Sequence, residues 1–116
     1  MAAGQTETRR EIAMIVTIFR SRLREEHRTE YERWAHEMDE LAHTMPGFLS
    51  IKTFRADDGE RVSIVEFRDW ESLKNWAHNP RHREAQRLGR EKFYLEFHLQ
   101  SGEVARESHF VDEAAR

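Results

Sequence analysis

The sequence of 116 residues contains no cysteine and little of the residues that break regular structure, with two prolines and five glycines. The lack of cysteine excludes disulfide bonds, thiolate nucleophiles and cysteine-ligated metal sites, and it suits the reducing cytoplasm. No apolar run approaches the roughly 20 residues of a membrane-spanning helix, and the first residues lack the uninterrupted apolar core of a secretory signal peptide. We therefore expect a soluble, cytoplasmic protein without a membrane partner.

An excess of charge of one sign is also missing. Nineteen lysines and arginines stand against 22 aspartates and glutamates, giving a formal net charge of −3. Opposite charges alternate along the chain, which is typical of solvated faces and not of a nucleic-acid-binding surface. The sequence has no glycine-rich phosphate loop and no G-x-S-x-G nucleophile elbow. Nucleic acid is therefore not an expected partner, and the common phosphate-binding and serine-hydrolase signatures are excluded.

The pattern of apolar residues predicts a β-α-β-β-α-β order with the second helix split in two. The expected elements are a strand at 14–20, a helix at 25–44, strands at 48–54 and 61–68, helices on either side of Asn79-Pro80, and a strand at 93–100. A bulge or bend is expected at Ser101-Gly102, with a further strand at 103–110. This order is the ferredoxin-like α+β plan.

The domain organisation expected from this pattern is simple. Residues 1–12 are polar and unpatterned and are interpreted as a flexible extension, 13–110 as one domain, and 111–116 as a frayed tail. In the first strand, Val16 and Ile18 point to one face, whereas Ile15 and Phe19 point to the other. Apolar residues on both faces indicate that both are covered, one by helices and one by a second subunit. We therefore expect a homodimer formed through the sheets.

The stretch from Asp69 to Tyr94 carries most of the functional information. Asp69 is a good N-cap for a helix whose apolar face includes Trp76, and Asn79-Pro80 ends this helix and starts another. His82, Gln86 and Arg90 then follow at four-residue steps, which places them on one stripe of the second helix. An indole and a row of hydrogen-bonding side chains are thus predicted to face the same part of the molecule.

The residues W-x-H-x-P-x-H-x-x-A-Q-x-x-G-R-x-x-x-Y, after a strand ending in F-R-D, resemble the antibiotic biosynthesis monooxygenase family. The resemblance extends from about Met14 to Phe110. It implies a ferredoxin-like domain that pairs into a dimeric α/β barrel. The family includes cofactor-free oxygenases, haem-degrading proteins and proteins of no known activity, so the resemblance is specific for the fold and less so for the reaction.

The leading functional hypothesis from this resemblance is a cofactor-independent monooxygenase that uses dioxygen to oxidise a flat aromatic molecule, such as a polycyclic phenol. Trp76 would stack on the substrate, and His82 would handle the proton, because imidazole titrates near neutral pH. Gln86 and Arg90 would hold oxygen atoms, Gln86 within the catalytic group and Arg90 as a binding residue. The expected aromatic walls of the binding site are Phe19, Phe67 and Phe97.

Plainer interpretations of the same residues remain open. Trp76 is equally consistent with a core residue of an amphipathic helix, and His82 with a solvent-exposed side chain between two arginines. A non-catalytic small-molecule-binding module would also use such a pocket. The aromatic walls are likewise consistent with ordinary core residues.

Haem and metal sites are weaker alternatives. The resemblance implies that haem-degrading members have a first-strand asparagine, a helix tryptophan and a haem-ligating histidine ten residues later. Trp76 matches, but Phe19 and Gln86 stand at the other two positions, and Gln86 is not an ordinary axial ligand. His82 lies one turn earlier and is the remaining candidate ligand. The histidine pairs at 36/43 and 78/82 come without a convincing third ligand, so no metal site is expected.

Overall fold

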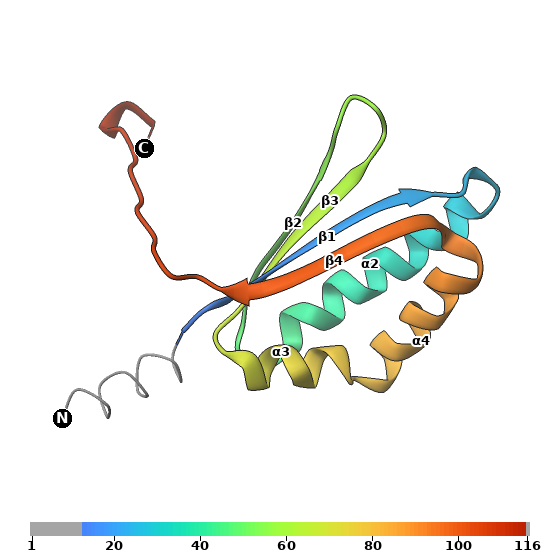
Figure 1. Cartoon of the computed structure of the whole chain (residues 1–116), viewed down its shortest axis with the longest axis horizontal. Coiled ribbons are helices and arrows are strands. Elements are labelled where there is room, and N and C mark those ends of the chain that lie inside the picture. The colour runs from blue at the N-terminus through green and yellow to red at the C-terminus, as the bar shows by residue number, and fades with distance from the viewer. Residues whose placement is uncertain (1–12, 116) are drawn as a thin grey trace.

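The computed structural model describes residues 13–115, and the expected extension at 1–12 lies outside this range. A four-stranded sheet and a layer of helices make up most of the described chain (Figure 1). The elements are β1 (Ile15–Leu23), η1 (Glu25–His27), α2 (Arg28–Thr44), β2 (Phe48–Arg55), β3 (Arg61–Phe67), α3 (Trp70–Ala77), α4 (Pro80–Leu88), η2 (Gly89–Phe93), β4 (Tyr94–Glu103) and η3 (Glu113–Ala115). None of these helices has the length and apolar character needed to cross a membrane.

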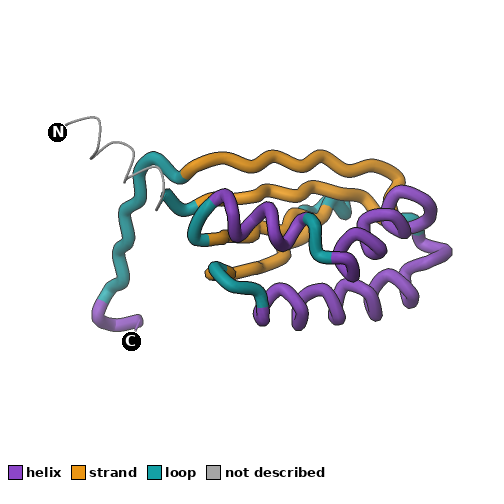
Figure 2. The backbone as a smooth tube through the Cα atoms, turned by 90° about the horizontal axis from the view of Figure 1, so that it is seen from below, coloured by secondary structure: helices purple, strands orange, loops and turns teal. Residues whose placement is uncertain are grey.

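All neighbouring strands are antiparallel, in the order β2-β3-β1-β4. The first strand thus lies between the third and the fourth, which interlocks the two β-α-β halves. Figures 1 and 2 show α2, α3 and α4 on the same side of the sheet. This arrangement confirms the predicted ferredoxin-like α+β fold.

The strand register decides which side chains face the helices. Ile15 of β1 lies opposite Phe67 of β3, and Thr17 lies opposite Val65, so all four share the helix-covered face. Val65 and Phe67 pack with Ala42 of α2 and with Trp76 of α3 in the hydrophobic core. The core therefore lies at the beginning of β1 and the end of β3.

Gly47 fixes the distance between the end of α2 and the start of α3. Its φ is +82°, a conformation that favours glycine, and a Cβ at this position would overlap the Ser72 hydroxyl group. The Gly47 carbonyl also accepts a hydrogen bond from the Arg68 backbone N–H at 2.7 Å. The turn thus holds the beginning of α3 against the sheet.

The ends of two elements differ from the sequence-based expectation. The predicted bulge at Ser101-Gly102 is wrong, because β4 pairs regularly with β1 there and the Ser101 and Thr17 hydroxyl groups are 2.7 Å apart. The register shift lies instead between Arg22 and Leu23, at the other end of the strand pair. The predicted strand at 103–110 is also wrong, since residues 104–112 have no regular structure.

The sheet face opposite the helices carries a second group of apolar side chains. Ile18 of β1 lies directly opposite Ile64 of β3 on this face, and Ile18 is 36% exposed. Phe54 of β2 shares the face because it pairs with Val62 of β3, and it is 49% exposed. Half-exposed β-branched and aromatic residues are thus concentrated on a face that no described helix covers.

Candidate functional site

Two side-chain caps define the ends of the helices that carry the candidate residues. The Asp69 carboxylate accepts a hydrogen bond from the Ser72 backbone N–H at 2.8 Å and begins α3, as its sequence predicts. Hydrogen bonds from Ser72 are the main reason that the pKa of Asp69 lies below its usual range. The Asn79 side chain accepts hydrogen bonds from the backbone N–H groups of Arg81 and His82 and begins α4. Side chains therefore cap the first turns of both helices.

An ion pair joins α4 to α2. The Arg81 guanidinium donates to the Glu37 carboxylate and lies 4.2 Å from the centre of the Trp34 ring. The same guanidinium therefore takes part in both an ion pair and a cation–π contact. These contacts hold the first turn of α4, which contains His82, against α2.

Trp76 and His82 form a stacked pair across the break between α3 and α4. Their ring centroids are 3.8 Å apart and the ring planes differ by 14°. Trp76 is only 7% exposed and packs in the core beside Val65 and Phe67. One face of the indole is thus covered by the imidazole, and His82 is partly buried and not a freely solvated side chain.

The hydrogen bonds of His82 determine which of its nitrogens carries hydrogen. His82 Nδ1 is 2.9 Å from the backbone carbonyl oxygen of Trp76. A carbonyl oxygen only accepts, so Nδ1 carries the hydrogen and Nε2 of the neutral ring keeps its lone pair. Burial lowers the pKa of His82, and the hydrogen bond to Trp76 opposes this only in part. The ring is therefore a neutral base at neutral pH.

Gln86 completes this group from the next turn of α4. Its side-chain amide nitrogen donates to the Ala77 carbonyl oxygen at 3.2 Å and lies 3.4 Å from His82 Nδ1. Because the Nδ1 hydrogen is directed at the Trp76 carbonyl, the Ala77 carbonyl is the acceptor for Gln86. Gln86 thus ties α4 to the last turn of α3 beside the imidazole.

A second group of candidate residues lies around β4. The Phe19 ring contacts Tyr94 at 5.4 Å and Phe97 at 5.6 Å between centroids, and the Arg90 guanidinium is 5.8 Å from the Phe97 ring centre. Phe97 is 42% exposed and Leu99, on the same helix-facing side of β4, is 53% exposed. We call Phe97 and Leu99 the β4 apolar strip.

The candidate residues therefore fall into two clusters. Trp76, His82 and Gln86 form one, while Phe19, Arg90 and Phe97 form the other. In residues 13–115, no ring contact or hydrogen bond connects the clusters. Phe67 belongs to neither, because it is fully buried in the core and packs edge-on against Phe48.

Sequence reasoning missed the partners that hold these side chains. Tyr94 joins Phe19 to Phe97, and it packs so closely on Gly89 that a Cβ there would lie 2.6 Å from the Tyr94 ring. Burial is the main cause that raises the pKa of Tyr94 above its usual range. The G-R-x-x-x-Y spacing was the available signal, since it brings Tyr94 to the start of β4.

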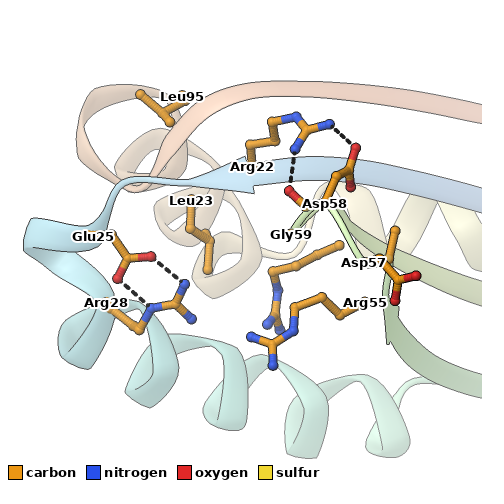
Figure 3. Close-up of a pocket in the computed structure, with 11 residues that line it drawn as sticks. Arg22, Leu23, Glu25, Arg28, Arg55, Asp57, Asp58, Gly59 and Leu95 are labelled. Atoms are coloured by element: carbon orange, nitrogen blue, oxygen red, sulfur yellow. Dashed lines mark hydrogen bonds and ion pairs between the residues drawn. The ribbon is translucent and has the colours of Figure 1, made fainter.

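A cavity of about 690 Å³ lies elsewhere (Figure 3). Its lining comes from the end of β1, the start of α2, the β2–β3 hairpin and Leu95, and includes none of the predicted site residues. Trp76 packs near the beginning of β1, so the cavity and the Trp76–His82 pair are at opposite ends of this strand. Within the described part of the chain, no cluster of three or more metal-ligating side chains occurs.

Comparison with known proteins supports the family resemblance of the sequence. Residues 14–88 match the family model of antibiotic biosynthesis monooxygenases. The uncharacterized protein YqjZ of Bacillus subtilis (strain 168) is 28% identical over 92 residues, which cover 79% of this chain and 81% of YqjZ.

Solved structures share the fold at lower sequence identity. Rv0793 from Mycobacterium tuberculosis superposes with a TM-score of 0.74 at 16% identity, covering 84% of this chain and all of that protein. SnoaB from Streptomyces nogalater, a cofactor-independent oxygenase, superposes with a TM-score of 0.70 at 15% identity, covering 83% of this chain and 96% of SnoaB. At these identities the superpositions establish the fold.

Proposed function

Since the chain belongs to the antibiotic biosynthesis monooxygenase family, we propose that it is a cofactor-independent monooxygenase that oxidises a flat, electron-rich aromatic molecule, such as a polycyclic phenol, with dioxygen. SnoaB, which has the same fold, is an oxygenase of this cofactor-independent type. The observation that carries the proposal is the neutral His82 base supported by Trp76.

The proposed first step is removal of the phenolic proton by His82 Nε2. Within residues 13–115, Nε2 makes no hydrogen bond, so it is the nitrogen that would accept the proton of an incoming hydroxyl group. After proton transfer, the Trp76 carbonyl still accepts the Nδ1 hydrogen, and the indole face lies against the imidazolium ring. Both contacts stabilise the charged ring. Because Trp76 is almost fully buried and its indole lies against His82, its proposed role is to position His82, in place of the predicted stacking on the substrate.

The resulting phenolate supplies the electrons that reduce dioxygen. One oxygen atom forms a bond to the ring carbon and becomes a quinone oxygen, while the other leaves as water with two hydrogens taken from the substrate. The step balances without a metal or a flavin, because the aromatic substrate itself is the reductant. In this step the protein contributes the base.

The β4 apolar strip is the proposed platform for the aromatic rings of the substrate. Phe97 and Leu99 are half-exposed on the side of the sheet that faces the helices, and aromatic surfaces gain from contact with such side chains. Arg90, which lies next to Phe97, would hold an oxygen atom of the substrate. Phe19 would pack against the Phe97 ring and hold it in place.

Oxygen consumption by the purified, metal-stripped protein tests this proposal. With a panel of hydroxylated anthracenes and naphthalenes, we expect protein-dependent oxygen uptake and quinone formation. His82→Gln should reduce the rate about 100-fold or more, because a positioned general base contributes at least that much. His78→Gln, which changes an exposed histidine four residues away, is the matched control and should leave the rate unchanged.

Two outcomes would change the proposal. Equal rates for the wild type and His82→Gln would remove the assigned base. Tight binding of a polycyclic phenol without uptake above autoxidation would favour the non-catalytic binding module.

We also propose that the protein forms a homodimer through the uncovered face of the sheet. Ile18, Ile64 and Phe54 supply its apolar surface. Exposed apolar surface of this kind is typical of protein interfaces.

A further inference from the structure

Four arginines contribute to the 690 Å³ cavity at the end of β1. The guanidinium groups belong to Arg22 of β1, Arg28 of α2, Arg55 of β2 and Arg61 of β3. The charged lining also includes three carboxylates, those of Glu25, Asp57 and Asp58. Positive charge therefore exceeds negative charge in the lining.

Two of these arginines already have carboxylate partners (Figure 3). Arg22 forms an ion pair with Asp58 at 2.8 Å, and Arg28 forms one with Glu25 at 2.8 Å. Arg28 is the main cause of the lowered pKa of Glu25, and the charge of Arg55 adds to it more weakly. Both of these carboxylates are therefore already committed to hydrogen-bonded partners.

Arg55 and Arg61 remain without such a partner in residues 13–115. They are direct cross-strand partners at the end of the β2–β3 hairpin. Like charges directly opposite each other destabilise a sheet. A negative charge bound between Arg55 and Arg61 would reduce this repulsion.

The Arg61 side chain is held in place beside the cavity. Its Nε atom is buried and has no hydrogen-bond acceptor among the described residues, while its guanidinium lies 5.5 Å from the centre of the Tyr31 ring of α2. A buried donor without an acceptor is costly and is uncommon in folded proteins. Because protein atoms cover Nε, an anion in the cavity would be bound by the terminal Nη groups of Arg61, which the contact with Tyr31 holds in place.

We propose that this cavity binds a small molecule through a carboxylate or phosphate group held between Arg55 and Arg61. Both oxyanions accept paired hydrogen bonds from the planar guanidinium group. The cavity is open to solvent on one side and has room for a small anion. Asp57, a third charged group of the lining without an ion-pair partner in the described chain, leaves a balance of one positive charge and offers an acceptor for a hydroxyl group of the ligand.

Calorimetric titration of the full chain with pyrophosphate and with citrate, in a buffer low in chloride, tests the site. We expect saturable binding of at least one probe, and Arg55→Gln and Arg61→Gln should each weaken it about tenfold or more, the effect of losing a hydrogen bond to a charged group. Arg33→Gln removes the same charge from an exposed position of α2 and is the matched control. It should bind like the wild type.

The two probes also distinguish the two possible ligand groups. Tighter binding of pyrophosphate would support the site with a phosphoryl ligand, and tighter binding of citrate would support it with a carboxylate ligand. If Arg61→Gln does not fold, Arg55→Gln decides the result. No saturable binding of either probe at millimolar concentration, or an equal loss in Arg33→Gln, would overturn the proposal.

This site is independent of the proposed oxygenase reaction. His82→Gln changes a residue outside the cavity lining and should bind both probes like the wild type. Failure of the oxygen-uptake experiment would therefore leave the anion-binding result unchanged, and the reverse also holds.

Discussion

At the level of single residues, His82 connects the structure to the proposed chemistry. Its Nδ1 hydrogen is fixed by the Trp76 carbonyl, and its ring lies flat on the Trp76 indole. Burial favours the uncharged ring. A histidine in this environment is a base at neutral pH and takes up a proton only from a well-placed donor or from a more acidic solution.

The lowered pKa of His82 also predicts a dependence of stability on pH. The unfolded chain takes up a proton near pH 6.5, the ordinary histidine value, whereas the folded protein resists protonation until a lower pH. This contribution to stability is therefore present above the ordinary value and is lost as the pH falls toward the folded pKa. Urea unfolding between pH 5 and pH 8 should show the stability difference between the wild type and His82→Gln shrinking toward low pH.

His78→Gln provides the comparison for this measurement, because His78 is exposed at the end of α3. A constant difference between the wild type and His82→Gln over the whole range would contradict the assignment of a buried, neutral imidazole.

At the level of secondary structure, the turns decide where the candidate residues lie. Gly47 and Gly59 both have positive φ, but only Gly47 faces another side chain, the Ser72 hydroxyl group. Substitution at Gly59 therefore tests backbone strain alone, whereas substitution at Gly47 tests backbone strain and steric overlap together.

Replacing each glycine by alanine should reveal this difference. Gly59→Ala should lower the free energy of unfolding by about 1 kcal/mol, the cost of a left-handed conformation. Gly47→Ala should cost about 1–3 kcal/mol more, because the added methyl group must displace Ser72. Chemical denaturation of both variants measures the difference, and equal losses would show that Ser72 moves freely.

Helix caps could be predicted from the sequence, whereas contacts between elements could not. Asp69 and Asn79 were recognisable as caps because their type and position suffice. The stacking of Trp76 on His82 was not, since helical spacing relates residues within one helix and these two lie on either side of a break. Arg55 and Arg61 looked like solvated charges, because only the hairpin register brings them together under α2.

The strand ends show a similar limit. Ser101-Gly102 has the composition of a bend, yet the neighbouring β1 supplies regular pairing partners and a hydroxyl contact from Thr17. Tertiary pairing therefore outweighs the local preference of these two residues. The strand order and the α+β class were predictable because they depend on the sequence of elements and not on exact boundaries.

For the whole molecule, the two faces of the sheet differ in what covers them. One face supports the helices and both of the proposed ligand sites, while the other presents Ile18, Ile64 and Phe54. Pairing through the second face would leave the ligand sites of each subunit open to solvent. Assembly and ligand binding would then be separable by mutation.

We expect sedimentation of the wild-type protein to give the mass of a dimer. Ile18→Glu places a charge next to Ile64 in the centre of the uncovered face and should shift the protein to monomer with its circular dichroism spectrum retained. Arg33→Glu, on the exposed surface of α2, should remain dimeric. A monomeric wild type, or a dimer unaffected by Ile18→Glu, would contradict assembly through this face.

The central claim is tested most directly by isotope labelling. A hydroxylated anthracene that is turned over in the oxygen-uptake assay is incubated with metal-stripped protein under ¹⁸O₂, and its quinone product is analysed by mass spectrometry. We expect one labelled oxygen atom per product molecule, formed at a rate that depends on His82 and not on His78. Product formed equally fast with His82→Gln, or without label from dioxygen, would contradict a monooxygenase that uses His82 as its base.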